Sequence, residues 1–201
     1  QKTKATKLDV PTGTPNILLL PGSRESEIAS NLPMQQDVLD MICLEHPQTE
    51  AVIACRHEDV SRIEPLADGL PIVVDDLASS LKWADLALTV SGTVSLHVMR
   101  HETPMIGMYK VGLLSRIGAS ILLNTPYRLL PNLIAQSQIV PEFIPCGNAV
   151  HNISQTALEL LANPELMEQQ QINLQHITAQ YASHDPSREA AEIILSFGCT
   201  N

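Results

Sequence analysis

Two short glycine turns carry residue types that could hold an anion. The first runs from Pro21 to Arg24 (Pro-Gly-Ser-Arg) and the second from Ser91 to Thr93 (Ser-Gly-Thr). Each turn follows a short apolar run and precedes a helical pattern. Glycine lets the main chain turn sharply and lets a ligand approach it closely. The first N–H groups of a helix have no partner within the helix, so both turns predict sites where main-chain N–H groups meet a negative charge.

The side chains of these turns support that prediction and leave alternatives open. The guanidinium of Arg24 suits a diphosphate held through two hydrogen bonds; the alternative is a surface ion pair with Glu25 or Glu27. The first turn lacks the Lys-Ser/Thr ending of a Walker A loop. Thr93 is expected to cap the helix that follows the second turn. The alternative for the second turn is an ordinary strand-to-helix connection that binds nothing.

The turns are positioned by short apolar runs that alternate with helical patterns. This alternation predicts an α/β fold, a doubly wound (Rossmann-like) parallel sheet of about five or six strands with helices on both faces. Both turns should then lie along the edge formed by the carboxyl ends of the strands. The expected strands are residues 16–20, 51–55, 72–74, 86–90 and 105–109, and the expected helices are 25–45, 58–66, 78–84, 93–101, 111–123, 164–181 and 188–197, with further helix from His151.

Composition restricts the class of protein. The 201 residues include 22 Asp and Glu against 12 Lys and Arg, a net charge of −10, which argues against nucleic-acid binding and against a polybasic membrane patch. The four cysteines form no C-x-x-C pair and are expected to be reduced, mostly buried thiols of a cytoplasmic protein. The chain begins with Gln rather than Met, so we expect that it was cut from a longer polypeptide.

Two histidines have the spacing of metal ligands. His97 and His101 are four residues apart on one expected helix and therefore share a face. However, no Glu follows His97, and the sequence offers no evident third ligand. We therefore expect no metal site, with His97 facing a ligand cleft and His101 nearer to solvent.

Three blocks of sequence resemble one family. They are Leu-Leu-Leu-Pro-Gly-Ser-Arg-x-x-Glu (18–27), Ser-Gly-Thr with the later Pro-Met and Tyr-Lys pairs (91–110), and Leu-Pro-Asn-Leu-Ile-Ala with Val-Pro-Glu (130–142). Together they are similar to the donor-binding half of lipid-A-disaccharide synthases, which are inverting glycosyltransferases of the two-domain GT-B type. The resemblance extends over about residues 16–197.

The resemblance implies one half of a GT-B architecture. It divides the chain into a linker (1–15), a nucleotide-sugar-binding Rossmann-like domain (16–150) and C-terminal helices that pack on it (151–201). It implies UDP-2,3-diacylglucosamine as donor, a β-1,6 lipid A disaccharide as product, UDP as leaving group, and no metal or cofactor. The lipid acceptor and the general base would belong to an N-terminal half, so no catalytic residue is assigned and the isolated chain is expected to be inactive. The implied nucleotide contacts are Gly22, Ser23, Arg24, Ser91, Gly92, Thr93, His97, Tyr109 and Asn132.

The sequence also departs from the family pattern. His97 stands where the family has a Glu that is expected to meet the ribose, and Gln136-Ser137 stands where the family has Gly-Arg. Asn132 offers amide donors and an acceptor to a base or sugar; the alternative is an Asx turn after Pro131. The departures leave two other functions open: a non-catalytic nucleotide-sugar-binding module, or another UDP-sugar enzyme such as a GlcNAc transferase or epimerase. Peripheral contact with the inner membrane and a homodimer also stay open.

Overall fold

Six parallel strands form a single sheet in the order β3-β2-β1-β4-β5-β6. The computed structural model describes residues 15–110, 125–147, 149–182 and 194. The central strand β1 is wholly buried, as its apolar sequence predicts. This is the strand order of doubly wound nucleotide-binding domains, so the expected fold is confirmed. The strands are β1 Asn16–Leu20, β2 Glu50–Cys55, β3 Ile72–Val74, β4 Leu86–Thr89, β5 Met105–Met108 and β6 Glu142–Phe143.

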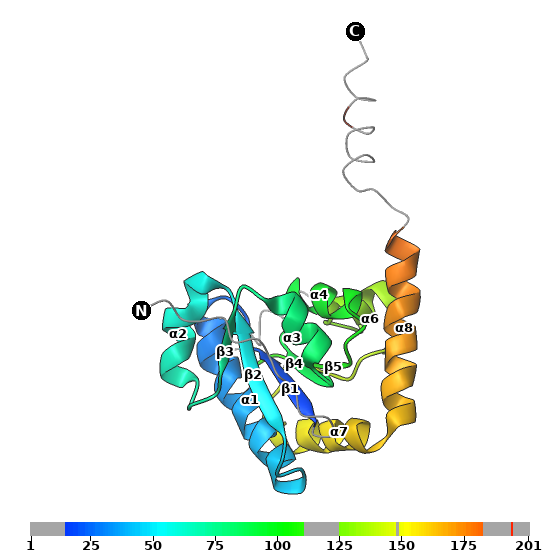
Figure 1. The fold of residues 1–201 in the computed structure, drawn as a ribbon. Helices are drawn as coiled ribbons and strands as arrows, with labels where there is room; N and C mark the ends of the chain where they lie inside the picture. Colours follow the sequence, from blue (N-terminus) through cyan, green and yellow to red (C-terminus); the bar gives the residue numbers. More distant parts are fainter. Residues whose placement is uncertain (1–14, 111–124, 148, 183–193, 195–201) are drawn as a thin grey trace.

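Helices cover both faces of the sheet (Figure 1). Alternate residues of β1 point to opposite faces: Ile17 and Leu19 pack in one core cluster with α1, α2 and α7, whereas Leu18 and Leu20 pack in the other with α3, α4 and α8. The helices are α1 Glu25–Glu45, α2 Val60–Ile63, α3 Leu77–Trp83, α4 Val94–Arg100, α6 Leu130–Ala135, α7 Val150–Ala162 and α8 Pro164–Ala182.

The two C-terminal helices pack on opposite faces of the sheet. α7 buries Ile153 and Ala157 against α1, and α8 buries Leu174 and Ile177 in the other core cluster, beside α4 and α6 (Figure 1). Gln170 of α8 accepts a hydrogen bond from the main-chain N–H of Met105, at the start of β5, over 2.6 Å. The inner faces of α7 and α8 are thus used within the chain.

Several elements differ from those predicted. Residues 58–66 do not form one helix: α2 lies between two short 3₁₀ turns, His57–Asp59 and Glu64–Leu66, and Pro65 has no N–H to continue a helix. The helix α6 and the strand β6 were not predicted as regular elements. Apart from Pro15 and Ile194, the predicted linker and the predicted helices at 111–123 and 188–197 lie outside the described residues.

The fold creates a switch point between β1 and β4. From β1 the chain crosses to β2 on one side, and it later returns to β4 on the other. The connections that follow these two strands therefore diverge, and ligands of doubly wound sheets bind in the crevice this divergence opens at the carboxyl ends of the strands. Among the described residues, no helix combines the length and the hydropathy that a membrane span requires.

Candidate ligand-binding site

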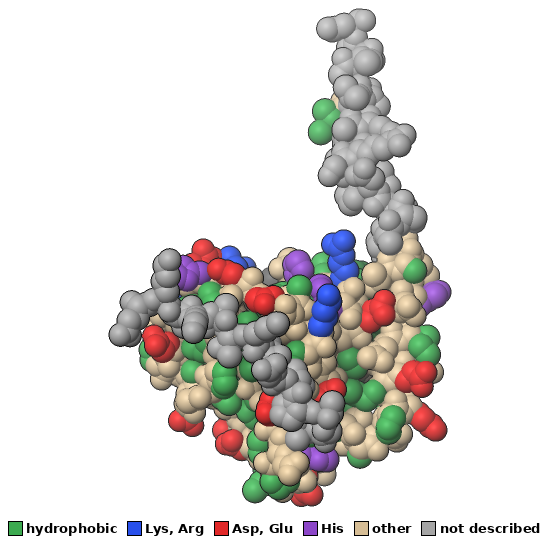
Figure 2. Space-filling view, in the orientation of Figure 1, with side chains coloured by type: hydrophobic (Ala, Val, Ile, Leu, Met, Phe, Trp, Pro, Cys, Tyr) green, Lys and Arg blue, Asp and Glu red, His purple; other side chains and the backbone are tan. Residues whose placement is uncertain are grey.

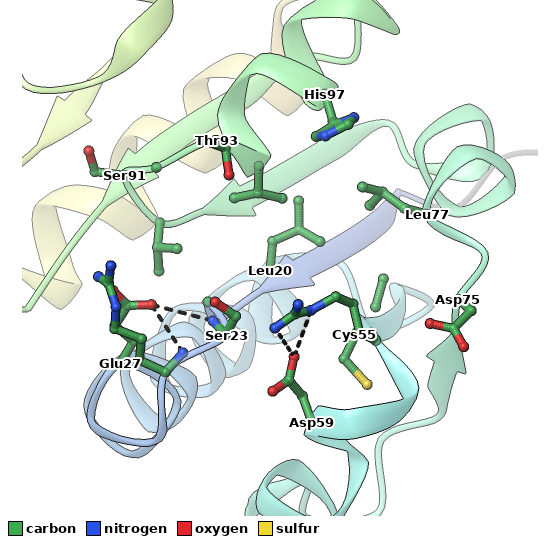
Figure 3. Close-up of a pocket in the computed structure, with 17 residues that line it drawn as sticks. Leu20, Ser23, Glu27, Cys55, Asp59, Asp75, Leu77, Ser91, Thr93 and His97 are labelled. Atoms are coloured by element: carbon green, nitrogen blue, oxygen red, sulfur yellow. Dashed lines mark hydrogen bonds and ion pairs between the residues drawn. The ribbon is translucent and has the colours of Figure 1, made fainter.

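A cavity of about 660 Å³ lies at the carboxyl ends of the central strands (Figure 3). Seven of the nine predicted site residues line it, all of them from the two glycine turns and α4. Gly22 and Gly92 thus meet at one cavity, as the parallel sheet requires. Figure 3 shows Ser91, Thr93 and His97 along one side of the cavity, with Ser23, Glu27 and Asp59 across from them. The predicted residues that line it are Gly22, Ser23, Arg24, Ser91, Gly92, Thr93 and His97.

The first turn is already occupied by a carboxylate of the chain itself. Oε2 of Glu27 accepts the main-chain N–H groups of Ser23 and Arg24, each over 3.3 Å. Oε1 pairs with Nη1 of Arg24 over 2.8 Å. The alternative ion pair of Arg24 is therefore the arrangement in this structure, and the expected free N–H groups at Ser23 and Arg24 are engaged.

The second turn differs because its main chain is open. Gly92 has a φ of +146°, which favours glycine, and a Cβ atom there would meet nothing within 4 Å. Among the described residues, no acceptor faces the main-chain N–H groups of Gly92, Thr93 or Val94. Thr93 is at the N-cap position of α4, but its side chain makes no capping hydrogen bond, which corrects that expectation. The second turn therefore has main-chain donors to offer to a ligand.

The two histidines lie as predicted. His97 lines the cavity, whereas His101 is exposed at the end of α4 and its Nδ1 lies 2.9 Å from the main-chain oxygen of His97. No group of three potential metal ligands occurs among the described residues. The imidazole of His97 is thus placed to meet a ligand.

Tyr109 follows β5 and does not itself line the cavity, but it contacts Glu27, which does. Its hydroxyl donates to Oε1 of Glu27 over 3.2 Å. Burial, and next the neighbouring Glu27 carboxylate, raises the pKa of the Tyr109 phenol. Tyr109 therefore acts on the first turn through Glu27.

Asn132 is fully buried, and its amide is used inside the chain. Its Nδ2 donates to the main-chain oxygen of Val140 over 2.8 Å and to Glu142 over 2.9 Å, and its Oδ1 accepts the N–H groups of Ile139 and Val140. Both sequence interpretations of Asn132 are corrected, because it neither lines the cavity nor forms an Asx turn; it lies within α6.

The block from Leu130 to Glu142 holds in place the neighbouring segment that contacts the second turn. The Glu142 carboxylate accepts the main-chain N–H groups of Arg128 and Leu129, each over 2.9 Å. The main-chain oxygen of Arg128 accepts the hydroxyl of Ser91 over 3.0 Å. These contacts explain the third sequence block as packing that positions the turn.

Further residues that line the cavity follow β2 and β3. Arg56 follows β2 directly and pairs over 3.1 Å with Asp59, whose side chain is 2% exposed. Asp75 follows β3 and accepts the main-chain N–H of His57 over 3.0 Å. Sequence reasoning missed both, although the rule that placed the two turns, the common edge of parallel strands, applies equally to residues 56 and 75.

The lining carries two guanidinium groups, from Arg24 and Arg56, against three carboxylates, from Glu27, Asp59 and Asp75. Arg24 and Arg56 each have a carboxylate partner, but their side chains are 79% and 59% exposed and keep further N–H donors. Burial, with Asp59 and Asp75, raises the pKa of Cys55 to about 11. On the face shown in Figure 2, Lys and Arg form no continuous patch. A phosphate ligand would therefore rely on two particular guanidinium groups and the open second turn.

The fold matches one half of known glycosyltransferases. A spinosyn rhamnosyltransferase, solved in complex with thymidine diphosphate, has a TM-score of 0.59 at 15% identity, covering 85% of this chain and 43% of that one. A second solved structure is a protein from Listeria monocytogenes assigned as a UDP-N-acetylglucosamine 2-epimerase. It has a TM-score of 0.56 at 17% identity, and the match covers 94% of this chain and 46% of that one. The sheet, its strand order and the cavity at the switch point define the class as one Rossmann-like half of a GT-B architecture.

Sequence comparison then identifies the family. A family model described as lipid-A-disaccharide synthetase matches residues 1–195, so the chain belongs to that family. It is 30% identical to the lipid-A-disaccharide synthase of Pseudomonas aeruginosa (strain UCBPP-PA14), and this match covers 94% of this chain and 50% of the relative. It is also 30% identical to the lipid-A-disaccharide synthase of Rickettsia prowazekii (strain Madrid E), where the match covers 86% of this chain and 48% of the relative. The chain thus spans about half the length of these relatives.

Proposed function

We propose that this chain is the donor-binding half of a lipid-A-disaccharide synthase-like glycosyltransferase. In this proposal it binds UDP-2,3-diacylglucosamine, and the complete enzyme forms a β-1,6 lipid A disaccharide and releases UDP. The observation that carries the proposal is the cavity between the two glycine turns, found in a chain of this family. The similarly folded rhamnosyltransferase that holds thymidine diphosphate supports a nucleoside diphosphate as the class of ligand.

The cavity offers two kinds of group to such a ligand. The open N–H groups of the second turn and the exposed guanidinium groups of Arg24 and Arg56 can donate to the diphosphate, whose negative charge increases when the sugar leaves. His97 can accept a hydrogen bond from a ribose hydroxyl. In the proposal the lipid acceptor and the general base belong to the other half of the enzyme, so no catalytic residue is assigned here.

The departures at His97 and Ser137 favour a second candidate, a nucleotide-sugar-binding module without catalytic activity. An imidazole accepts only one hydrogen bond where a carboxylate accepts several. Ser137 lacks the guanidinium that the family pattern has at that position. Both candidates require the same nucleotide site, and they differ in whether the complete polypeptide transfers sugar.

Amide chemical shifts measured while UDP is added test the site. We expect the largest shifts at Gly92, Thr93 and His97, with small shifts in the groove between α7 and α8, for example at Gln169. Large shifts confined to that groove would contradict the proposed position of the nucleotide. Disaccharide formation by the complete polypeptide, with UDP-2,3-diacylglucosamine as donor, separates the enzyme from the non-catalytic module.

A further inference from the structure

At one end of the cavity, several hydrogen-bond donors converge on the carboxylate of Glu27. It accepts two main-chain N–H groups of the first turn, a guanidinium nitrogen of Arg24 and the hydroxyl of Tyr109 (Figure 3 shows the contacts with the turn). Its side chain is 10% exposed. The carboxylate therefore connects the start of α1 with the end of β5, although β4 lies between β1 and β5.

The missing side chain of Gly22 leaves the space that this carboxylate occupies. A Cβ atom at position 22 would lie 2.8 Å from Oε2 of Glu27 and 3.0 Å from its Cβ, and the φ of Gly22 is +105°. Real Cβ atoms do not approach an oxygen so closely, so only glycine lets the turn close around Glu27. From the sequence, a ligand was expected to approach the main chain closely at this turn. In the structure the side chain of Glu27 makes this close approach instead.

The groups that hold Glu27 are also those that a phosphate would use. Main-chain N–H groups at a helix start and an arginine fork bind carboxylates and phosphates alike. The Arg24 side chain is 79% exposed, and such exposed pairs are weak, so an entering anion can take Arg24 over. The negative charge of Glu27 stays beside that anion.

The geometry points to Glu27 as an internal competitor that lowers the affinity of the cavity for the diphosphate of its nucleotide ligand. This inference rests on the proposed function, because it concerns the same cavity. Glu27 keeps the main-chain donors of the first turn occupied and shares Arg24 with the ligand. The diphosphate is thereby directed to the open second turn, and product nucleotide is held less tightly.

Calorimetry with UDP, uridine and inorganic pyrophosphate on the unmodified chain and on Glu27→Gln tests the inference. Gln keeps the size of the side chain and one acceptor but removes the charge. We expect Glu27→Gln to bind UDP and pyrophosphate about three- to tenfold more tightly, with the affinity for uridine changed less than twofold. Glu27→Ala, which leaves the turn without a side-chain acceptor, should also tighten the binding of UDP and of pyrophosphate.

Glu25→Gln is the matched control, because Glu25 is an exposed carboxylate in the same first turn of α1. It should change the UDP affinity less than twofold. In an Arg24→Ala background the gain from Glu27→Gln should shrink, since the shared partner is missing. Equal or weaker binding of UDP and pyrophosphate by a folded Glu27→Gln variant would overturn the inference. Tighter binding of pyrophosphate without any binding of UDP would support it and contradict the proposed nucleotide site.

Discussion

The side-chain nitrogen of Gln35 lies 3.0 Å from the main-chain oxygen of Leu88, across 53 positions of sequence. The same nitrogen donates to the oxygen of Leu20 over 3.2 Å, and Gln35 is fully buried. One side chain of α1 thus joins the ends of β1 and β4, just before the two glycine turns.

Replacing Gln35 by Met should destabilise the chain. Met has a similar shape but no donor, so the main-chain oxygens of Leu20 and Leu88 each lose one hydrogen bond, although the oxygen of Leu20 keeps its bond from the N–H of Val90. We expect the free energy of unfolding in urea to fall by about 1–3 kcal/mol. Gln36→Met is the control, because Gln36 makes one hydrogen bond, to the oxygen of Leu66, and is only partly buried. An equal or larger loss for Gln36→Met would contradict the importance of the Gln35 contact.

Asn132→Ala should affect stability more than ligand binding. The substitution removes hydrogen bonds to residues 139, 140 and 142, all of them buried or partly buried. We expect the free energy of unfolding to fall by about 1–3 kcal/mol, and the UDP affinity of the folded variant to change less than threefold. A variant that keeps its stability but loses UDP binding would restore Asn132 as a ligand contact.

Cys55 should react slowly with iodoacetamide at pH 8. Its thiol has a pKa of about 11 in place of 9.0, and the thiolate is the form that reacts. We expect alkylation at least about tenfold slower than in the unfolded chain, with the rate rising from pH 9 to pH 11. UDP should slow Cys55 further and leave Cys43, which is outside the cavity lining, unchanged. If Cys55 in the folded chain is alkylated as fast as in urea, the Cys55 thiol is not buried as the structure shows it.

Gln136→Gly should stabilise the chain. Gln136 ends α6 with a φ of +52°, a left-handed conformation that is strained for a residue with a Cβ atom. After the entropy cost of glycine, we expect a gain of about 0.5–1 kcal/mol in unfolding free energy. Ser137→Gly, at the next position, lacks a positive φ and should give no gain. A loss of stability for Gln136→Gly would mean that the side chain of Gln136 makes a stabilising contact.

Sequence reasoning predicted most of the framework of the site. The first helix begins and ends at the predicted residues, Glu25 and Glu45, and the two turns meet at one edge because both follow buried parallel strands. These features depend on local pattern and on the geometry of parallel sheets, which the sequence carries directly.

The rest depended on contacts between distant residues. The sequence offered an ion pair of Arg24 with Glu27 as an alternative, but no pattern indicates that the Glu27 carboxylate also accepts the main-chain N–H groups of residues 23 and 24. Nor does any pattern indicate that Tyr109, 82 positions away, reaches it. Asn132 was placed in the site by resemblance alone, whereas its partners are hidden in the fold seven to ten positions away. β6 has only two residues, too few to show a strand period.

The identity of residue 97 bears most directly on the claim that the cavity holds a nucleotide. A glutamate there can accept hydrogen bonds from both ribose hydroxyls, whereas neutral histidine accepts one. His97→Glu should therefore tighten UDP binding by about 1 kcal/mol, the net value of one hydrogen bond. His101→Glu makes the same change one turn later on an exposed position outside the cavity lining and should leave the affinity unchanged.

Titration calorimetry of UDP into the unmodified chain, His97→Glu and His101→Glu is the decisive measurement. We predict binding by the unmodified chain within the millimolar range, tighter binding by His97→Glu, and no difference for His101→Glu. If neither the unmodified chain nor His97→Glu binds UDP at millimolar concentration, the cavity is not a UDP-sugar site.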